Sequence, residues 1–323
     1  MNRQKLALRL LDPVKNKLGG SSIGDKMTED NLLDKQTSGT AMATAFLRAL
    51  AAYDSRKGIR GSDNLAEIFL GDEQKKPLKD EAARAWVLQN RVSPGMYEFM
   101  IARTAFFDQI VEQALKANIP QIVFLGAGYD SRPYRFEKFI QDTVIFELDT
   151  KPTQQHKQDC LRQAQISISR QIRFVPVNFA TDNLMDKLVE AGFSREKRTL
   201  FVWEGVTYYL NAEVVDNMLI LIKENTPSGS SICFDYAAFS SEVLNEHSVK
   251  EFRSYMRSHH ANEPTKFSIR AGEIDSFLAN KDFEVVEHLT ADEMTEKYLS
   301  DNGRLDIGKA LSLFCLVHAK VKQ

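Results

Sequence analysis

The chain has 323 residues, of which 43% are hydrophobic and 27% charged, a composition typical of a globular protein with a sizeable core. Its formal net charge of −2 excludes the strong basic field that draws proteins to nucleic acid or membrane surfaces. The three cysteines are odd in number and far apart, and no apolar run is long enough to span a membrane, so we expect a cytoplasmic protein without disulfide bonds.

Residues 1–117 are predicted to form a helical N-terminal cover that precedes the first strand. Residues 1–35 are charged and mixed, and an amphipathic helix there would be either a packing helix or a membrane anchor. Apolar periodicity and capping residues predict helices over residues 37–53, 64–70, 81–89 and 96–117. Such a cover would either lie over the ligand end of a sheet or pack beside it.

Residues 118–323 alternate strand and helix patterns. Strands are predicted over residues 122–125, 143–149, 171–177, 199–203, 230–236, 283–288 and 311–320, with the last two forming a hairpin-like edge. The alternation predicts an α/β fold with a mainly parallel, seven-stranded sheet and helices on both faces. A polar insertion, residues 240–268, contains several aromatic residues and would be either a substrate lid or an amphipathic packing helix.

The first strand ends in Gly126-Ala127-Gly128, a turn at which a ligand can approach bare backbone. Glu147 and Asp149 end the next strand and point to the same side of it. They follow the first glycine by about 20 residues, the sequence separation at which an acidic residue binds a ribose diol. A third glycine is missing, and Asp130 would repel a pyrophosphate. The pattern therefore favours a cationic, ribose-containing ligand without phosphate, and S-adenosylmethionine is such a ligand.

Further polar residues follow the next two strands. Asn178 would bond the adenine amino group, Phe179 would pack on the ring, and Glu204 would meet the methionine ammonium or line the reaction site. The polar groups best placed to act in catalysis are Tyr208, Tyr209 and Glu204. The histidines have no recognisable spacing, and the adjacent pair at 259 and 260 lacks companion ligands, so we expect no metal site.

Four segments at these strand ends resemble the motifs of the leucine carboxyl methyltransferase-like family, and in particular its bacterial branch of S-adenosylmethionine-dependent O-methyltransferases. They read LGAGYDSRPYR, FELD, VPVNFATD and EGVTYYL, and the upstream SPGMYEFMIARTAFFD resembles the family's Arg-containing segment. The resemblance covers roughly residues 37–236. It implies a Rossmann-like class I methyltransferase fold, S-adenosylmethionine as cofactor, and O-methylation of a small-molecule or carboxylate acceptor.

The resemblance also implies roles for individual residues. Arg103 would bind the methionine carboxylate, and Asp149 would take the ribose. The full cofactor-binding set that we expect is Arg103, Gly126, Ala127, Gly128, Asp130, Glu147, Asp149, Asn178, Phe179 and Glu204. Acceptor binding is expected from Arg132, Tyr208 and Tyr209.

Two departures from the family pattern stand out. Asn178-Phe179 replaces a usual Asp pair, and the lysine of the eukaryotic enzymes has no counterpart in residues 40–48, where Thr44 is the candidate replacement. Arg132 and Arg135 would either steer a carboxylate acceptor or pair on the surface with Asp130 or Glu137.

Two alternatives to methyl transfer stay open at this point. A cofactor-binding or regulatory protein on the same fold would bind the ligand without turnover, and the Asn178 departure leaves room for it. A nicotinamide-dependent oxidoreductase is the other, and the missing third glycine disfavours it. For methyl transfer itself, a carboxylate acceptor is already a nucleophile, whereas a hydroxyl or an amine would need a general base.

Overall fold

The computed structural model of the protein describes residues 39–54, 56, 63–179, 181–259, 265–301, 304–305 and 307–322. The predictions for residues 1–35 and for His260 fall outside these ranges. No helix in the described part of the chain is long and apolar enough to cross a membrane.

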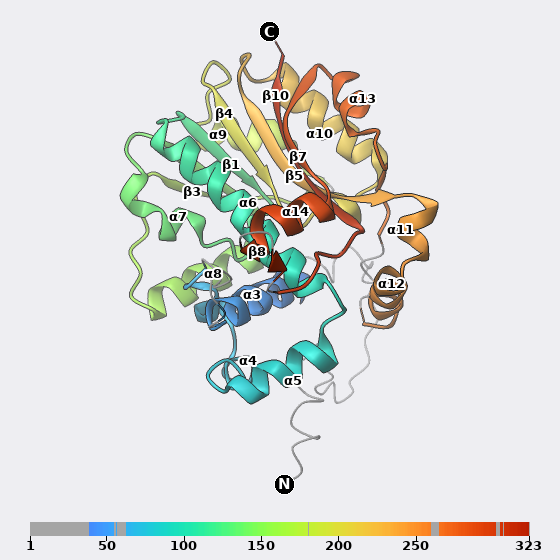
Figure 1. Cartoon of the computed structure of the whole chain (residues 1–323). Coiled ribbons are helices and arrows are strands. Elements are labelled where there is room, and N and C mark those ends of the chain that lie inside the picture. Colours follow the sequence, from blue (N-terminus) through green and yellow to red (C-terminus); the bar gives the residue numbers. More distant parts are fainter. Residues whose placement is uncertain are drawn as a thin grey trace, which may run out of the picture.

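A single large sheet forms the centre of the molecule (Figure 1). Within the described residues, seven strands are hydrogen-bonded in the order β3-β2-β1-β4-β5-β10-β7, and a short eighth strand, β6, pairs with β5. The first five strands run parallel, and β10 is antiparallel to both of its neighbours. Their bounds are β1 (Gln121–Leu125), β2 (Val144–Asp149), β3 (Ile172–Pro176), β4 (Thr199–Trp203), β5 (Ser231–Phe239), β6 (Ile269–Arg270), β7 (Phe283–Leu289) and β10 (Phe314–Val321).

The prediction of a mainly parallel α/β sheet is confirmed, with two additions. Strand β6, at the end of the predicted insertion, is an extra two-residue strand. Strands β7 and β10 do pair antiparallel, but α14 (Ala291–Tyr298) and the small ladder of β8 (Ser300–Asp301) with β9 (Arg304–Leu305) separate them along the chain. Strand β10 lies between β5 and β7, so β7 alone forms this edge of the sheet and β3 forms the other.

The helices form a cover at the N-terminal part of the chain and two layers on the sheet. The helices of the cover are α3 (Gly39–Ala52), η1 (Ala66–Phe69), α4 (Asp72–Lys75), α5 (Glu81–Arg91) and α6 (Met96–Lys116). Those of the α/β part are α7 (Arg132–Arg135), η2 (Glu137–Phe139), α8 (Lys151–Gln163), α9 (Leu184–Glu190), η3 (Thr207–Tyr209), α10 (Ala212–Glu224), α11 (Ser241–Asn245), α12 (His247–His259) and α13 (Ile274–Ala279).

Strand β1 shows why its residues form a central strand. Its five residues are all buried, and successive side chains point to opposite faces of the sheet. Ile122 and Phe124 join the core shared with α3 and α6, whereas Val123 and Leu125 join the core shared with α9 and α10. A continuous apolar run is what a strand covered on both faces requires.

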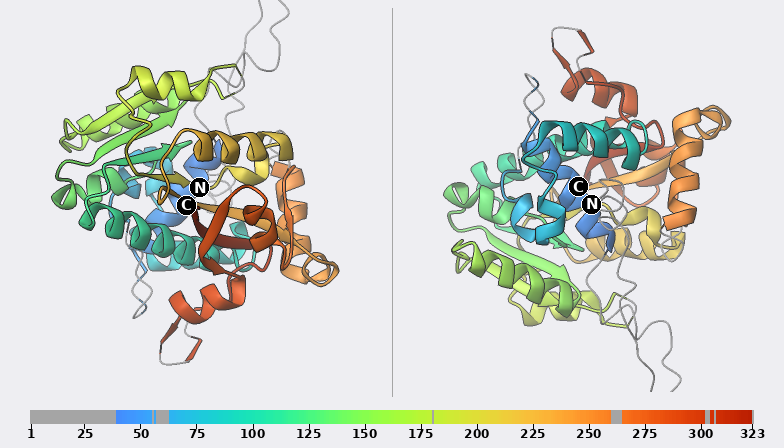
Figure 2. Two further views of the ribbon diagram at one scale, coloured as in Figure 1. Left: turned by 90° about the horizontal axis from the view of Figure 1, so that it is seen from above. Right: turned by 90° about the horizontal axis from the view of Figure 1, so that it is seen from below.

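The cover lies at the ligand end of the sheet as well as beside it. Helix α6 packs along one face and buries Phe99, Phe106 and Phe107 completely. Helix α3 crosses the carboxyl ends of the parallel strands, as the view from below in Figure 2 shows, and α5 lies beyond α3 (Figure 1). Helices therefore cover the carboxyl ends of the strands, which is where an open α/β sheet binds its ligand.

Candidate functional site

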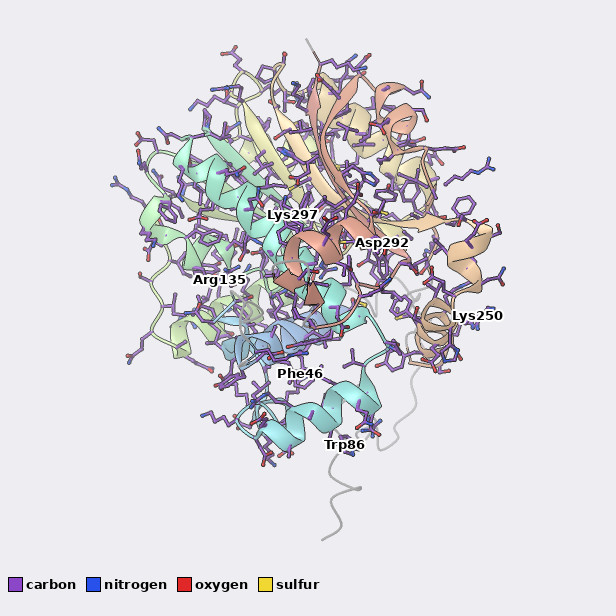
Figure 3. All side chains as sticks on the ribbon, viewed as in Figure 1. Phe46, Trp86, Arg135, Lys250, Asp292 and Lys297 are labelled. Carbon is purple, nitrogen blue, oxygen red and sulfur yellow. The ribbon has the colours of Figure 1, made fainter. Side chains whose placement is uncertain are left out.

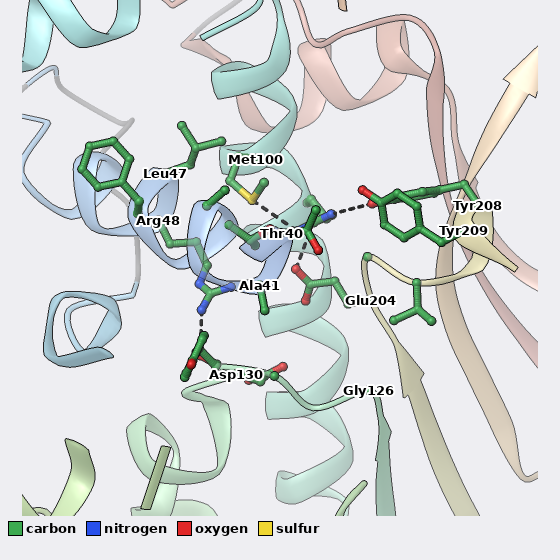
Figure 4. A pocket seen from close by; sticks show the side chains of 18 of the residues that line it. Thr40, Ala41, Leu47, Arg48, Met100, Gly126, Asp130, Glu204, Tyr208 and Tyr209 are labelled. Atoms are coloured by element: carbon green, nitrogen blue, oxygen red, sulfur yellow. Dashed lines mark hydrogen bonds and ion pairs between the residues drawn. The ribbon is translucent and has the colours of Figure 1, made fainter. Parts of the chain in front are cut away.

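A cavity of about 390 Å³ lies between the carboxyl ends of β1, β2 and β4 and the helices that roof them. Its wall includes parts of α3, α5, α6, η3 and α12, and Figure 4 shows the side chains that line it. Most of the predicted site residues meet here. They are Arg103, Gly126, Ala127, Gly128, Asp130, Asp149, Phe179, Glu204, Tyr208 and Tyr209.

The glycine turn forms the floor at the end of β1. Gly126 has a φ of +70° and Gly128 a φ of +42°, the left-handed region that L side chains rarely adopt. A Cβ on Gly126 would lie 2.9 Å from Cγ2 of Val206. The turn is fixed to the next strand because the Ala127 N–H donates to the Leu148 carbonyl at 2.8 Å. Gly126 is therefore required for both conformation and space and Gly128 for conformation, and both leave backbone facing the cavity.

Asp149 is held at the tip of β2 by two backbone donors. Its Oδ2 accepts from the Gly128 N–H and its Oδ1 from the Thr150 N–H, each at 2.7 Å. Burial nevertheless raises the pKa of this carboxyl group above its ordinary value. A carboxylate offers about four acceptor positions, so acceptor capacity remains for a hydroxyl donor of a ligand in the cavity.

A chain of buried ion pairs lies at the end of β4. Glu204 contacts Arg132 at 2.6 Å and Arg103 at 2.9 Å, and Arg103 continues to Asp235 at 3.0 Å. Arg132 also contacts Asp130 at 2.6 Å. Burial alone would raise the pKa of Glu204, but the two arginines outweigh it and hold the pKa below its usual range. Glu204 is therefore an anion with little basicity.

Two atoms of this chain of ion pairs keep unused hydrogen-bonding capacity. Arg103 Nε and Glu204 Oε1 lie 2.9 Å apart without the alignment of a hydrogen bond, and within the described residues neither has another hydrogen-bond partner. Both side chains line the cavity. A guanidinium donor next to a carboxylate acceptor fits the carboxylate and ammonium of an amino acid, which is the chemistry of the methionine part of S-adenosylmethionine.

The structure places three predicted site residues away from the cavity wall. Glu147 points into the protein, where it accepts from Lys157 at 2.6 Å and from the Tyr134 hydroxyl at 2.9 Å. It shares a side of the strand with Asp149, as predicted, but α8 covers it, whereas Asp149 stands at the open tip. The side chain of Asn178 is not on the wall either, although its neighbour Phe179 is.

The third is Arg132, which is buried and held by Asp108, Asp130 and Glu204. Arg132 does pair with Asp130, as one of the two alternatives predicted. The pair is buried, however, and does not lie on the surface as expected. Arg135 is likewise buried and pairs with Asp108 at 2.7 Å. Because these partners occupy both guanidinium groups, neither group is well placed to steer an acceptor.

Several wall residues were not predicted from the sequence. Arg48 of α3 bonds Asp63 and the Tyr129 carbonyl, each at 2.7 Å, and so links the cover to the glycine turn. An arginine inside an Ala-rich, apolar helix was the signal that could have found it. Thr44, the candidate replacement for the family lysine, does line the cavity. The others come from α5, α6 and β10, and include Val87, Arg91, Met96, Met100 and Phe314. Phe252, Tyr255 and Met256 of α12 also line the cavity, and they belong to the insertion predicted to be either a substrate lid or a packing helix.

The groups on the described wall that could act as a general base are carboxylates and tyrosines. Among the described residues that line it there is no histidine, lysine or cysteine. Burial and the nearby Asp235 raise the pKa of Tyr208 well above its ordinary value, so its hydroxyl stays protonated. In the described part of the chain, no cluster of three or more potential ligands could hold a metal ion.

Comparison with known proteins places this chain in a family. The model of the leucine carboxyl methyltransferase family matches residues 41–223. A Bacillus subtilis relative, "Putative S-adenosyl-L-methionine-dependent methyltransferase YktD", is 30% identical over 262 residues, which cover 79% of this chain and 82% of the relative. A Mycobacterium ulcerans "Putative S-adenosyl-L-methionine-dependent methyltransferase" is 34% identical over 199 residues, 59% of this chain and 62% of that relative. These matches confirm the resemblance drawn from the motifs.

Solved structures agree on the fold. The crystal structure of a "putative methyltransferase" from Thermobifida fusca has a TM-score of 0.56 at 15% identity and covers 90% of this chain and 96% of its own. A DUF574 family protein from Streptomyces avermitilis has a TM-score of 0.55 at 14% identity and covers 90% of this chain and 99% of its own. At such identities the likeness establishes the architecture alone.

Proposed function

The chain belongs to the leucine carboxyl methyltransferase family and is an S-adenosylmethionine-dependent methyltransferase, and from this premise we propose that it methylates an oxygen of a carboxylate acceptor. The observation that supports the proposal is the make-up of the cavity. Its described wall has no histidine, lysine or cysteine, Glu204 is an anion of little basicity, and Tyr208 stays protonated. Asp130 pairs with Arg132 and Asp149 accepts two backbone N–H groups, so no wall residue stands out as a general base. An acceptor that is already ionised needs no such group.

We place the cofactor at the strand ends. The backbone of Gly126 and Gly128 would face its methionine part, and the unused acceptor positions of Asp149 would take the ribose hydroxyls. The Arg103–Glu204 pair would bind the amino-acid end, and Phe179 would pack against the adenine. The cofactor, when bound, supplies a methyl group on a positively charged sulfur atom, and its reactivity needs no activation by the protein.

The protein itself orients the acceptor and excludes water from the reacting atoms. The acceptor oxygen must approach the methyl carbon in line with the breaking bond, and a preformed cavity supplies that geometry. Apolar side chains from α6 and α12, among them Met100, Phe252 and Met256, line the cavity and exclude water from the reacting atoms. Tyr208 and Tyr209 stand near Glu204 (Figure 4) and would orient the acceptor oxygen as hydrogen-bond donors.

The chemical nature of the product tests the proposal. The protein is incubated with S-adenosylmethionine that carries a labelled methyl group and with panels of carboxylic acids, phenols, alcohols and amines. We expect label in products of the acid panel only. Methyl esters hydrolyse in mild base and release volatile labelled methanol, whereas methyl ethers and methylamines do not.

Two results would contradict the proposal in different ways. A base-stable labelled product would place the methyl group on a hydroxyl or a nitrogen. Calorimetric binding of S-adenosylmethionine without transfer to any panel would favour the alternative in which the protein binds the cofactor without turnover. The nicotinamide-dependent alternative is set aside, because the family's cofactor is S-adenosylmethionine.

A further inference from the structure

The charged side chains on the cavity wall are balanced, with one exception. Arg48 faces Asp63, Arg103 faces Glu204 and Asp235, Asp130 faces Arg132, and Asp149 accepts two backbone N–H groups. Arg91, the last residue of α5, lines the same cavity and is only half-buried. Within the described residues no carboxylate lies within ion-pair distance of it.

The contact that Arg91 does make leaves its charge uncompensated. Its guanidinium lies over the ring of Trp86, 5.7 Å from the centroid, one turn earlier on the same helix. Such a contact orients the group but leaves its N–H donors available. Trp86 is 40% exposed and lies at the outer side of α5, as Figure 3 shows.

The wall between Arg91 and the strand ends is apolar. Val87 and Met96 line it beside Arg91, and Met100, Phe252 and Met256 continue it toward the sheet. Helix α5 lies beyond α3 from the strand ends (Figure 1), so the part of the wall that α5 supplies, which includes Arg91, is opposite the glycine turn and Asp149. A ligand that spans this distance meets a cation, then an apolar wall, then the reaction site.

A second cavity adjoins the Arg91 end of the first one. It has a volume of about 860 Å³, lies between α5 and α12, and shares Arg91, Val92, Ser93 and Tyr255 with the first cavity. Arg91 is thus at the junction of the two. A group bound at this junction is separate from the oxygen that receives the methyl group.

From these observations we propose that Arg91 binds an anionic group of the acceptor and selects acceptors with an apolar body between this group and the methylated oxygen. The inference rests on the proposed methyl transfer and names its substrate class, an apolar acid with an anionic group at the end distant from the reaction. The planar fork of an arginine suits a carboxylate, which it can bind through two parallel hydrogen bonds.

The test uses three probes of equal length: dodecanedioate, its monomethyl ester and its neutral dimethyl ester. Their binding to the full chain with S-adenosylhomocysteine is followed through tryptophan emission. Trp203 is buried in the sheet and Trp86 adjoins Arg91, so a change in emission reports on this junction. We expect both anionic probes to bind about tenfold more tightly than the dimethyl ester.

Variants assign the preference to the residue. Arg91→Gln is expected to remove the difference in affinity between the probes. Arg91→Lys should reduce the preference for the anionic probes from about tenfold to about threefold, because the charge stays and the planar fork is lost. Arg162→Gln is the matched control, since Arg162 is an exposed arginine of α8 that pairs with Asp159 away from the cavity. It should bind all three probes as the unchanged chain does.

Equal binding of the three probes, no binding of any, or a preference that survives Arg91→Gln would overturn the inference. Label transfer is measured in parallel at saturating dodecanedioate. Base-labile methyl ester formed at the same rate by the unchanged chain and Arg91→Gln would leave the proposed function standing and remove the role of Arg91. Binding that depends on Arg91 with no ester formed would do the reverse.

Discussion

Gly126 is required in the turn for two reasons that mutation can separate. It has a left-handed backbone, and a Cβ there would lie 2.9 Å from Val206. Gly192 has a φ of +95°, but a Cβ on it would have no neighbouring atom within 4 Å, so it shares only the backbone strain. We expect Gly192→Ala to lower the free energy of unfolding by about 1 kcal/mol and Gly126→Ala by about 2–3 kcal/mol.

Urea unfolding measures both variants, and calorimetry measures their affinity for S-adenosylmethionine. Gly126→Ala should also abolish cofactor binding, because the new methyl group displaces the turn that faces the cavity. Val206→Ala combined with Gly126→Ala should recover part of the stability. Equal losses for the two glycine variants, with cofactor binding intact in both, would show that space at Gly126 does not matter.

The raised pKa of Asp149 predicts a pH dependence of cofactor binding. Burial raises this pKa, and below it the carboxyl group is protonated and loses an acceptor for the ribose hydroxyls. Affinity for S-adenosylmethionine should therefore be full above the raised pKa and fall as the pH is lowered through it. The effect on stability has the opposite sign, because a carboxyl group with a raised pKa favours the folded state at low pH. Protonation of Asp149 therefore weakens binding without unfolding the chain.

Calorimetric titration over a pH series provides the measurement. Asp149→Asn keeps the size but offers one acceptor oxygen, so it should lower the affinity roughly 10-fold or more and flatten the pH profile. Asp159→Asn, at a half-exposed position on α8, is the control. A profile that is unchanged in Asp149→Asn would remove Asp149 from the cofactor site.

At the scale of single elements, α8 is fastened to β2 by a buried ion pair. Lys157 Nζ lies 2.6 Å from Glu147 Oε2, and both side chains are about 1% exposed. Burial raises the pKa of Glu147, and its partners only partly offset this. Lys157→Met should lower the free energy of unfolding by about 3–5 kcal/mol, because it leaves a buried carboxylate unpaired.

The double variant Glu147→Gln with Lys157→Met should recover most of that loss, since no buried charge remains. Thermal unfolding measures the stability of both variants. Both should bind S-adenosylmethionine like the unchanged chain, in agreement with the position of Glu147 outside the cavity. Loss of cofactor affinity in the double variant, at full stability, would return Glu147 to the binding site.

Helix α12, in the insertion predicted to be either a lid or a packing helix, presents Phe252, Tyr255 and Met256 to the cavity. If it contacts the acceptor, Met256→Ala should raise the acceptor KM about fivefold, since a half-buried apolar contact is worth about 1 kcal/mol. The dissociation constant for S-adenosylmethionine should stay constant. Lys250→Ala, on the exposed side of α12 (Figure 3), is the control. Weaker cofactor binding in Met256→Ala would place α12 against the cofactor.

The sequence predicted the elements with strong periodicity and missed those without it. The buried strand β1 and the long helix α6 follow from apolar runs and from 3.6-residue periodicity. Strand β6 has two residues and α14 has eight mostly polar ones, so neither carries such a signal. Period-two reasoning put Glu147 and Asp149 on one side of β2 but contained no information on which of them a helix covers.

At the scale of the whole molecule, only part of the cavity could be predicted from the sequence. Its sheet side follows from the order of the strand ends, because parallel strands end at one edge. The side that we propose for the acceptor combines α3, α5, α6 and α12, which are distant in sequence and meet only in the folded chain. No local pattern marks Arg91 or Met256 as neighbours. The sheet side, where we propose that the cofactor binds, was therefore predictable in large part, and the side proposed for the acceptor required the structure.

The helical cover shares a core with the sheet, which bears on the predicted boundary at residues 117 and 118. One apolar cluster contains Phe46 of α3, Phe106 of α6, Ile122 of β1 and Leu316 of β10. Polar contacts add to it, since Arg48 bonds the Tyr129 carbonyl beside the glycine turn. Removal of the cover would expose to water the part of this face that α3 and α6 cover.

We therefore expect residues 118–323 alone to lack the cooperative heat unfolding of the full chain and to bind no S-adenosylmethionine. Calorimetric unfolding and cofactor titration of the fragment measure this. Addition of residues 1–117 as a separate chain is the control, because a shared core that forms between two pieces restores both properties in part. A fragment that unfolds cooperatively and binds the cofactor would make residues 118–323 an independent domain, and the cover would then serve the acceptor alone.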